Sequence, residues 1–282
     1  MIHQHQDQFD IAVMCEMLDV SRQGYYAWVN RPASARQQRR AQLIDRIRQV
    51  HEQSHGTYGS PRIHAELLEQ EIDVCVNTVA TWMKQAHIAA ITSRKFRVQT
   101  TDANHPHPVA ANVLDRDFAA SLPNQKWCVD ITYVPTGEGF LYLAAVLDLC
   151  SRKIVGWQMA DHLRTELCTD ALAMALQKRR PGAGLLHHSD RGVQYCCGDY
   201  QQMLLDHGIQ ASMSRTGNCY DNAMMESFWG TLKQEEVYQQ NYPTRQAARQ
   251  SIFAYLEGWY NRRRRHSALG YQSPEAFEAS LN

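Results

Sequence analysis

The 282-residue sequence lacks a long hydrophobic run, a secretion signal at its start and an excess of charge of either sign. Its most apolar segment, residues 140–149, is only about half as long as a helix that crosses a bilayer. Because the opening MIHQHQDQFD also lacks the basic and apolar stretches of a signal peptide, we expect a cytoplasmic protein without membrane attachment. The 29 basic residues balance the 29 acidic ones, so contact with nucleic acid would depend on local basic patches.

A disulfide framework is absent as well. Eight cysteines are scattered through the chain without the spacing of paired bridges, and we expect reduced thiols. What is present is an ordinary globular composition, with 44% hydrophobic and 21% charged residues, which excludes a disordered or collagen-like chain. At about 100 to 200 residues per domain, the length predicts about two domains.

Residues 1–100 have helical patterns throughout. The Ser-Pro pair at residues 60–61 and Asn77 are each placed to begin a short helix, and the two helices are joined by a tight turn. This arrangement predicts a helix-turn-helix that binds DNA, although a helical bundle without a role in DNA binding fits the same residues equally well. The polar stretch at residues 101–123 is expected to be a linker.

Residues 124–282 change to patterns typical of strands. Three apolar runs separated by short turns predict an antiparallel meander, at residues 126–135, 140–149 and 153–159. Further elements then alternate, with helices expected at 166–179, 199–207, 222–238 and 244–262 and strands at 184–188 and 209–214. The order predicts an α/β fold, a mixed sheet flanked by helices and preceded by a small all-α region.

Three carboxylates in this second part could carry chemistry. Asp130 lies in mid-strand among apolar residues, where a charge needs a cation or hydrogen-bond donors, and Asp190 directly follows a strand, where α/β sheets place ligand-binding residues. Glu226 lies on the helix at 222–238, and Lys233 follows two turns later on the same face. Each residue alone fits an ordinary turn, cap or surface role. Together, the three acids form the oxygen donor set that Mg²⁺ prefers.

Such a site would suit phosphoryl transfer. Two Mg²⁺ ions about 4 Å apart can activate an attacking oxygen and stabilise the leaving oxygen of a phosphodiester. Lys233 would then supply a positive charge to the phosphate backbone of the substrate.

A run of basic residues follows the last long helix. Like-charged runs are usually solvated, but beside a polynucleotide active site we expect these arginines to bind phosphates: Arg262, Arg263, Arg264 and Arg265. The arginines of residues 31–48 are interpreted in the same way, as are Arg94, Lys95 and Arg97.

Five segments, distributed over the whole of residues 124–282, resemble a known family: WCVDITYV, LDLCSRKIVGW, HHSDRGVQY, NCYDNAMMESFWGTLKQE and YNRRRRHSALGYQSPEAF. They are similar to the DDE transposases of bacterial insertion sequences, and more narrowly to the second-reading-frame (OrfB) products of the insertion-sequence-three family. The N-terminal LDVSRQGYYAW and YGSPRIHAEL resemble the same family. Thirty-five residues separate Asp190 from Glu226, which is the spacing of that family.

The resemblance implies an RNase H-like integrase catalytic core in which Asp130, Asp190 and Glu226 are the catalytic, metal-binding triad and Lys233 contacts DNA. It implies a transposase that cuts and joins DNA strands with two Mg²⁺ ions, for which Mn²⁺ can substitute, and that works as a homo-oligomer on element ends and target DNA. An upstream first-frame protein, either separate from this chain or fused to it, is the implied partner. The alternatives are a non-catalytic DNA-binding regulator and an RNase H-type nuclease that cuts without joining.

The sequence predicts structural roles for several other polar residues. Asp148 is expected in a turn, His187 and His188 in the packed core, and Asp221 with Asn222 at the N-terminal cap of the Glu226 helix. Retroviral integrases carry an N-terminal zinc module, but no Cys-x-x-Cys follows the early histidines of this chain, so we predict no zinc there.

Overall fold

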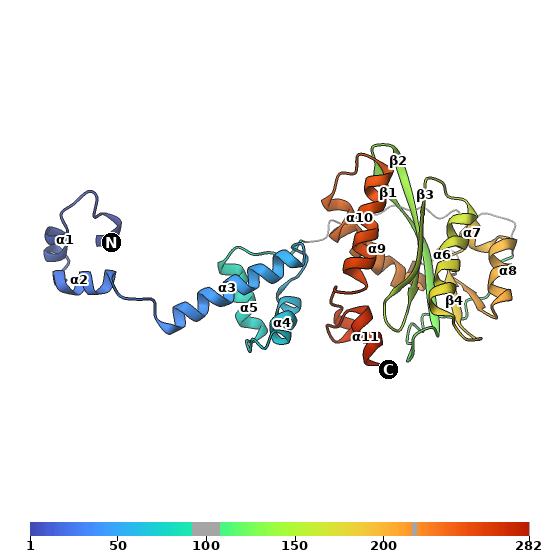
Figure 1. Ribbon diagram of the computed structural model, residues 1–282, viewed down its shortest axis with the longest axis horizontal. Coiled ribbons are helices and arrows are strands. Elements are labelled where there is room, and N and C mark those ends of the chain that lie inside the picture. Colours follow the sequence, from blue (N-terminus) through green and yellow to red (C-terminus); the bar gives the residue numbers. More distant parts are fainter. Residues whose placement is uncertain (92–107, 216–218, 282) are drawn as a thin grey trace.

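The computed structural model describes residues 1–91, 108–215 and 219–281. Its parts follow one another along the longest axis of the molecule, from a small helical unit at the N-terminus, through a second helical unit, to a larger α/β domain (Figure 1). The basic residues Arg94, Lys95 and Arg97, and positions 101–107 of the expected linker, lie outside the described residues.

The N-terminal unit has a very small core. Helices α1 (Ile11–Met17) and α2 (Arg22–Val29) pack around Ile2, Cys15 and Tyr25. The Ser21 hydroxyl accepts a hydrogen bond from the Gly24 amide at 3.0 Å, which caps α2.

The second unit consists of three helices, α3 (Ala35–Gln53), α4 (Ser60–Glu69) and α5 (Val76–Gln85). A capping box at Ser34 begins α3. Gly59 precedes α4 and Cys75 precedes α5, neither with a side-chain cap, so the predicted caps at residues 60 and 77 are wrong by one and two positions. The apolar faces of the three helices share one core: Ile47, Val50, Tyr58, Ile63, Leu67, Val79 and Met83.

The described residues of the third part form one five-stranded sheet in the order β3-β2-β1-β4-β5. Strands β1 (Lys126–Thr136), β2 (Gly139–Asp148) and β3 (Ile154–Ala160) form an antiparallel meander. Strands β4 (Leu186–Ser189) and β5 (Gln210–Met213) then add in parallel beside β1. The predicted mixed sheet is therefore confirmed.

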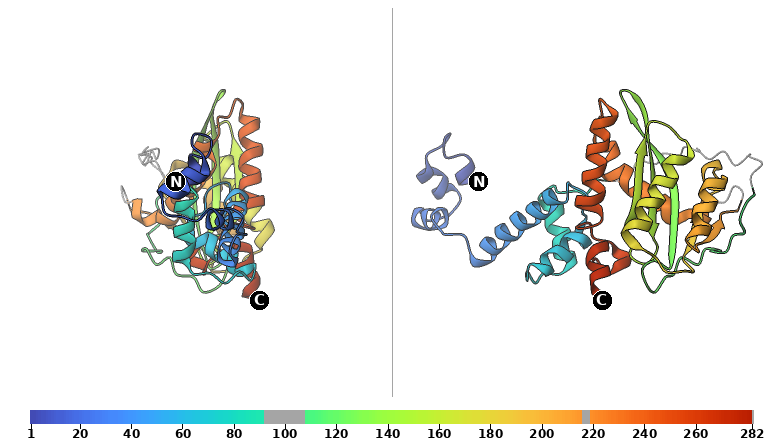
Figure 2. Two further views of the ribbon diagram at one scale, coloured as in Figure 1. Left: turned by 90° about the vertical axis from the view of Figure 1, so that its left-hand side faces the viewer. Right: turned by 45° about the vertical axis from the view of Figure 1, so that its right-hand side comes forward.

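Helices cover both faces of this sheet (Figures 1 and 2). Helices α6 (Thr165–Arg179), α7 (Val193–Cys196) and α8 (Gly198–Asp206) lie on one face, around Trp127 and Val129. Helices α9 (Ala223–Glu235) and α10 (Arg245–Phe253) lie on the other, around Cys128. The long helix predicted at 244–262 is observed as α10 and a π-helical stretch, Ala254–Tyr260, which continues α10 without a break. A short helix that was not predicted, α11 (Pro274–Ser280), follows.

The second helical unit contacts the α/β domain directly. Trp259 of the π-helical stretch packs against the core of the second helical unit and lies edge-on to His55, with ring centroids 5.6 Å apart. Arg265 donates to Glu66 at 2.6 Å and also pairs with Glu69, both on α4. The Tyr58 hydroxyl accepts a hydrogen bond from the backbone amide of Arg265 at 2.8 Å. Aromatic packing and ion pairs therefore hold the two parts together.

Within residues 1–91, 108–215 and 219–281, no helix is long and apolar enough to cross a membrane. The seven cysteines whose side chains are described are all free thiols.

Candidate active site

Strand register aligns the two candidate aspartates. β1 and β4 pair in parallel with Cys128 opposite His188; Asp130 comes two residues later in β1, and Asp190 comes two residues later, directly after the end of β4. Because side chains alternate along a strand, Asp130 shares the face of Cys128, which packs against α9. A slip of one residue would turn each side chain to the opposite face, so the register is what brings this pair together.

The two carboxylates are close enough to affect each other's charge. Loss of solvent, followed by repulsion from Asp190, raises the pKa of Asp130 to about 8. Asp130 is held by two donors: its Oδ1 accepts from the Ile131 amide at 2.8 Å, and its Oδ2 accepts from the Trp229 indole Nε1 at 2.9 Å. Asp190 Oδ1 accepts from the Gly192 amide at 2.9 Å.

Helix α9 brings the other two candidates to the same face of the sheet. Glu226 is exposed in its first turn, and partial loss of solvent raises the pKa of its carboxyl. Its charge acts on Asp130 more weakly than that of Asp190 does. Lys233 is half-buried with its Nζ 4.9 Å from the centre of the Tyr133 ring; burial lowers the pKa of its ammonium, while attraction to Asp130 opposes that shift.

The chemistry of this donor set fits a divalent cation. Asp130 and Asp190 repel each other, and a cation between them would remove that repulsion. In the described part of the chain, however, no three His, Cys, Asp or Glu side chains are gathered closely enough to hold a metal ion. The structure thus brings two of the three predicted ligands together, with Glu226 on the neighbouring helix but not gathered with them.

The start of α9 is fixed by Asp221, which the sequence predicted as a cap. Asp221 is fully buried and accepts hydrogen bonds from Asn112 at 3.0 Å, from Arg116 at 2.9 Å and from both the backbone and the guanidinium of Arg215. The cap residue, Asn222, makes no capping bond and donates to the β1 backbone instead. The predicted position of the cap is therefore confirmed at Asn222, but neither side chain makes a capping bond, because partners elsewhere in the fold take both of them.

We expect Asp221→Asn to lower the free energy of unfolding by about 2–3 kcal/mol at neutral pH, because it removes a buried charge from two half-exposed guanidinium groups. These arginines hold the pKa of Asp221 well below its usual range, so its contribution is present above the unfolded pKa, about 3.9, and is lost as pH falls through the folded value. Denaturation of both proteins between pH 7 and pH 3 should show their difference shrinking below about pH 4. The matched control is Asp115→Asn, which removes the 72% exposed partner of Arg215 and should change stability by less than about 0.5 kcal/mol.

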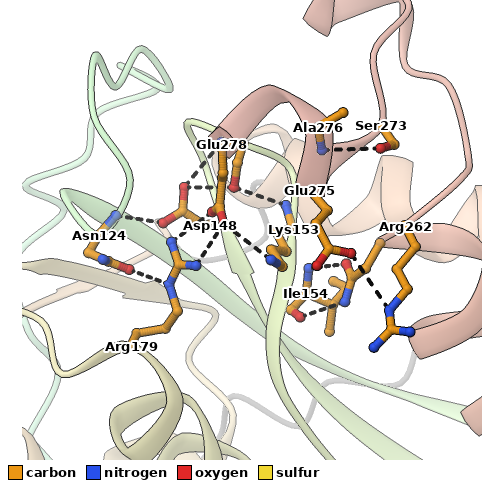
Figure 3. A network of polar contacts seen from close by, with 12 residues as sticks. Asn124, Asp148, Lys153, Ile154, Arg179, Arg262, Ser273, Glu275, Ala276 and Glu278 are labelled. Carbon is orange, nitrogen blue, oxygen red and sulfur yellow. Dashed lines mark hydrogen bonds and ion pairs between the residues drawn. The ribbon is translucent and has the colours of Figure 1, made fainter. Parts of the chain in front are cut away.

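The arginine run divides into two exposed and two engaged side chains. Arg262 and Arg263 are exposed, and Arg262 reaches Glu275 at 3.6 Å (Figure 3). Arg264 is only 4% exposed and is bound to Glu235, so the prediction that it binds DNA is wrong for this structure. The side chain of Arg265 is 14% exposed and its guanidinium is paired with the acids of α4, which also contradicts the prediction.

The remaining polar predictions concern residues close to the sheet. Asp148 is the last residue of β2 and is fully buried; it accepts from the Cys150 amide of the turn that follows and from the Asn124 amide (Figure 3). It also accepts from the Trp127 indole, and these bonds confirm its structural role at the turn. His187 and His188 are buried and bonded to Tyr200, Ser212 and Ser214, and burial lowers the pKa of both, to about 3 and about 4. These are packed neutral histidines, as expected.

One contact at the site was missed by reasoning from sequence. Trp229 donates to Asp130, and the only indication in the sequence is its position three residues after Glu226, on the same helix face as that acid and Lys233.

Comparison with known proteins gives matches over most of the chain. The family described as "Integrase core domain" matches residues 120–219 and, in a second form, residues 207–274, and the family described as "HTH-like domain" matches residues 38–96. The chain is 47% identical to the "Insertion element IS600 uncharacterized 31 kDa protein" of Shigella sonnei over 94% of this chain and 97% of the relative. It is 44% identical to "Transposase InsF for insertion sequence IS3A" of Escherichia coli (strain K12) over 98% of this chain and 96% of the relative.

Among solved structures, the chain matches the HTLV-2 integrase catalytic core domain in complex with magnesium at 15% identity and a TM-score of 0.43, over 57% of this chain and 99% of that one. A simian T-cell lymphotropic virus intasome chain matches at 14% identity and a TM-score of 0.48, over 82% of this chain and 74% of that one. The integrase-core match and the mixed sheet agree with the RNase H-like fold class that the sequence predicted.

Proposed function

Because the chain belongs to the family of insertion-sequence transposases that includes InsF of insertion sequence IS3, we propose that it moves DNA by cutting phosphodiester strands and joining the freed ends to a target. It is a transposase with an integrase core domain and an HTH-like DNA-binding region. The proposed DDE chemistry is supported by one observation above all: Asp130 on β1 and Asp190, directly after the neighbouring parallel strand β4, are close enough for their charges to interact, and α9, which carries Glu226, covers the face of Asp130.

In the proposed reaction, water and then a DNA 3′-hydroxyl attack phosphodiesters in line, without a covalent protein intermediate. Asp130, Asp190 and Glu226 would hold divalent cations, which we propose to be two Mg²⁺ or Mn²⁺ ions that supply Lewis acidity at the reacting phosphate. Two fixed donors orient the Asp130 carboxylate. Lys233, close enough to be attracted by Asp130, supplies a positive charge to the phosphate backbone on the same face.

DNA is the proposed partner of the rest of the molecule as well. We assign phosphate contacts to the exposed Arg262 and Arg263, in addition to Lys233. The division into a DNA-binding region at 1–100, a linker at 101–123 and a catalytic core at 124–282 belongs to this proposal, as do a homo-oligomer on DNA and an upstream first-frame protein. A reaction on chromosomal DNA would take place in the bacterial cytoplasm.

Arg263→Gln should weaken binding to DNA of every sequence and reduce the slope of log affinity against log salt concentration by about 1, because a phosphate contact releases about one counterion. Titration of the full chain with labelled duplex at several salt concentrations measures this slope. Arg180→Gln, which replaces an exposed arginine at the end of α6, is the matched control and should leave the slope unchanged. Equal slopes for all three proteins would remove Arg263 from the DNA interface.

The activity is best tested by joining on a branched DNA that mimics the strand-transfer product, because reversal on such a substrate needs little recognition of element ends. The full chain is assayed with Mg²⁺ or Mn²⁺ beside Glu226→Gln. We expect metal-dependent rejoining that the variant loses.

Each of the other outcomes would indicate a different function for this chain. Cutting without joining would indicate a plain nuclease. DNA binding without either activity would indicate a regulator or a chain that requires its upstream partner, and repeating the assay with the upstream frame fused on separates those two.

A further inference from the structure

Trp229 contacts the candidate site with the one polar atom of its side chain. Its indole Nε1 donates to Asp130 Oδ2 at 2.9 Å. The residue is 6% exposed, and its ring packs against Phe228 with centroids 4.7 Å apart, within the core between α9 and the sheet. A phenylalanine could fill an apolar core position, but it has no donor for this carboxylate.

The bond fixes the orientation of the Asp130 carboxylate. With Oδ1 bound to the Ile131 amide and Oδ2 bound to Trp229, both oxygens carry a fixed donor and the carboxylate cannot turn freely. A carboxylate has about four lone-pair sites, so each oxygen keeps one for a cation. Donors of this kind orient metal ligands in many proteins.

The same bond joins two elements of the site. Trp229 lies three residues after Glu226 on α9, and residues with this spacing are neighbours on a helix face. The indole therefore connects the helix of Glu226 to the strand of Asp130 at the level of the site.

We propose that Trp229 is a positioning residue for strand transfer, whose indole N–H holds Asp130 ready for a divalent cation and aligns α9 with β1. This inference rests on the proposed function, since it assumes that Asp130 is a metal ligand. Trp229 itself contacts neither metal nor DNA in this role and acts through Asp130.

Trp229→Phe in the full chain tests the proposal, because it keeps an aromatic ring in the core and removes only the donor. We expect Mn²⁺ binding, measured by calorimetry without DNA, to weaken by about 10- to 100-fold, the usual effect of losing a donor behind a metal ligand. The Mg²⁺ concentration that gives half-maximal joining should rise in parallel, and the melting temperature should change little.

Trp157→Phe is the matched control. Trp157 is half-buried on the same face of the sheet, and its indole Nε1 donates to a carboxylate oxygen of Glu257 at 2.8 Å. This variant loses an identical indole–carboxylate bond away from the aspartate pair. Its Mn²⁺ affinity should equal that of the unmodified protein.

The outcomes separate this inference from the function on which it rests. If Asp190→Asn loses Mn²⁺ binding while Trp229→Phe keeps it, the positioning role is overturned and the metal site stands. The proposed function itself fails if the unmodified chain binds no Mn²⁺, or if Asp190→Asn binds Mn²⁺ as well as the unmodified chain does. If Trp229→Phe unfolds, Trp229→Tyr provides a second variant, whose hydroxyl lies at the tip of the ring and not along its edge. If both variants unfold, Trp229 is a core residue only and the proposed positioning role is overturned.

Discussion

Asp190→Asn is expected to abolish strand cleavage and joining, lowering the rate by at least about 1000-fold, while the protein remains folded. The substitution removes one of the two interacting charges on β1 and directly after β4, and stabilisation by bound metal at a reacting phosphate is worth several kcal/mol. Folding should survive because the asparagine side-chain oxygen can still accept the bond from the Gly192 amide. The assay is joining of branched DNA with Mg²⁺, with the melting temperature measured in parallel.

The sign of the stability change gives a second check on the same variant. Asp190 repels Asp130, so its neutral replacement removes that repulsion and the metal-free variant should be at least as stable as the unmodified protein. Asp199→Asn, an exposed acid at the start of α8, is the matched control and should keep full activity. An Asp190→Asn protein that still joins DNA would exclude this residue from the mechanism.

Arg264→Ala is expected to cost about 3–5 kcal/mol of unfolding free energy, because it leaves Glu235 as a buried and unpaired charge. Arg264 donates to both oxygens of Glu235, at 2.7 and 2.8 Å, and the Tyr255 hydroxyl donates to the same carboxylate at 2.9 Å. Since Glu235 is the last residue of α9, the ion pair holds the end of the helix that begins near Glu226. Urea denaturation measures the loss.

Arg262→Ala is the control from the same arginine run. Its ion pair with Glu275 joins side chains that are 65% and 51% exposed, so its removal should change stability by less than about 0.5 kcal/mol. Replacing both buried partners, Glu235→Leu with Arg264→Met, should recover much of the loss, because the cost comes from the stranded charge. Equal small losses for Arg264→Ala and Arg262→Ala would contradict the structural role of Arg264.

Local patterns were sufficient for the strands and for the aspartate pair. The meander follows from short apolar runs broken by turns, and the observed strands begin and end within two residues of the predicted meander. Asp130 and Asp190 could be identified because an acid inside or directly after an apolar strand requires an explanation that a surface acid does not. Their alignment, however, depends on the parallel register of β1 and β4, which no local pattern contains.

The errors arose where distant partners decided the role of a residue. Asp221 has the sequence context of a helix cap, but Arg116, 105 residues earlier, is among the groups that bind it. The four arginines at 262–265 are equivalent in sequence, and which of them turns inward depends on the π-helical stretch before them and on Glu235, 29 residues before Arg264. Trp229 has the hydrophobic surroundings of any core aromatic, and only the folded sheet shows the carboxylate at its indole nitrogen.

The contact between α4 and the C-terminal segment limits which HTH-like units from related transposases could replace the one in this chain. Arg265 has its guanidinium on Glu66 and Glu69, and its backbone amide on Tyr58. A chimera that takes its HTH-like unit from another transposase must therefore bring an acidic pair and a hydroxyl to these positions, or leave a largely buried arginine without its partners. The HTH-like unit and the C-terminal segment are therefore complementary to each other. A graft that is meant to change DNA-end specificity has to include the residues of this contact as well as the DNA-binding helices.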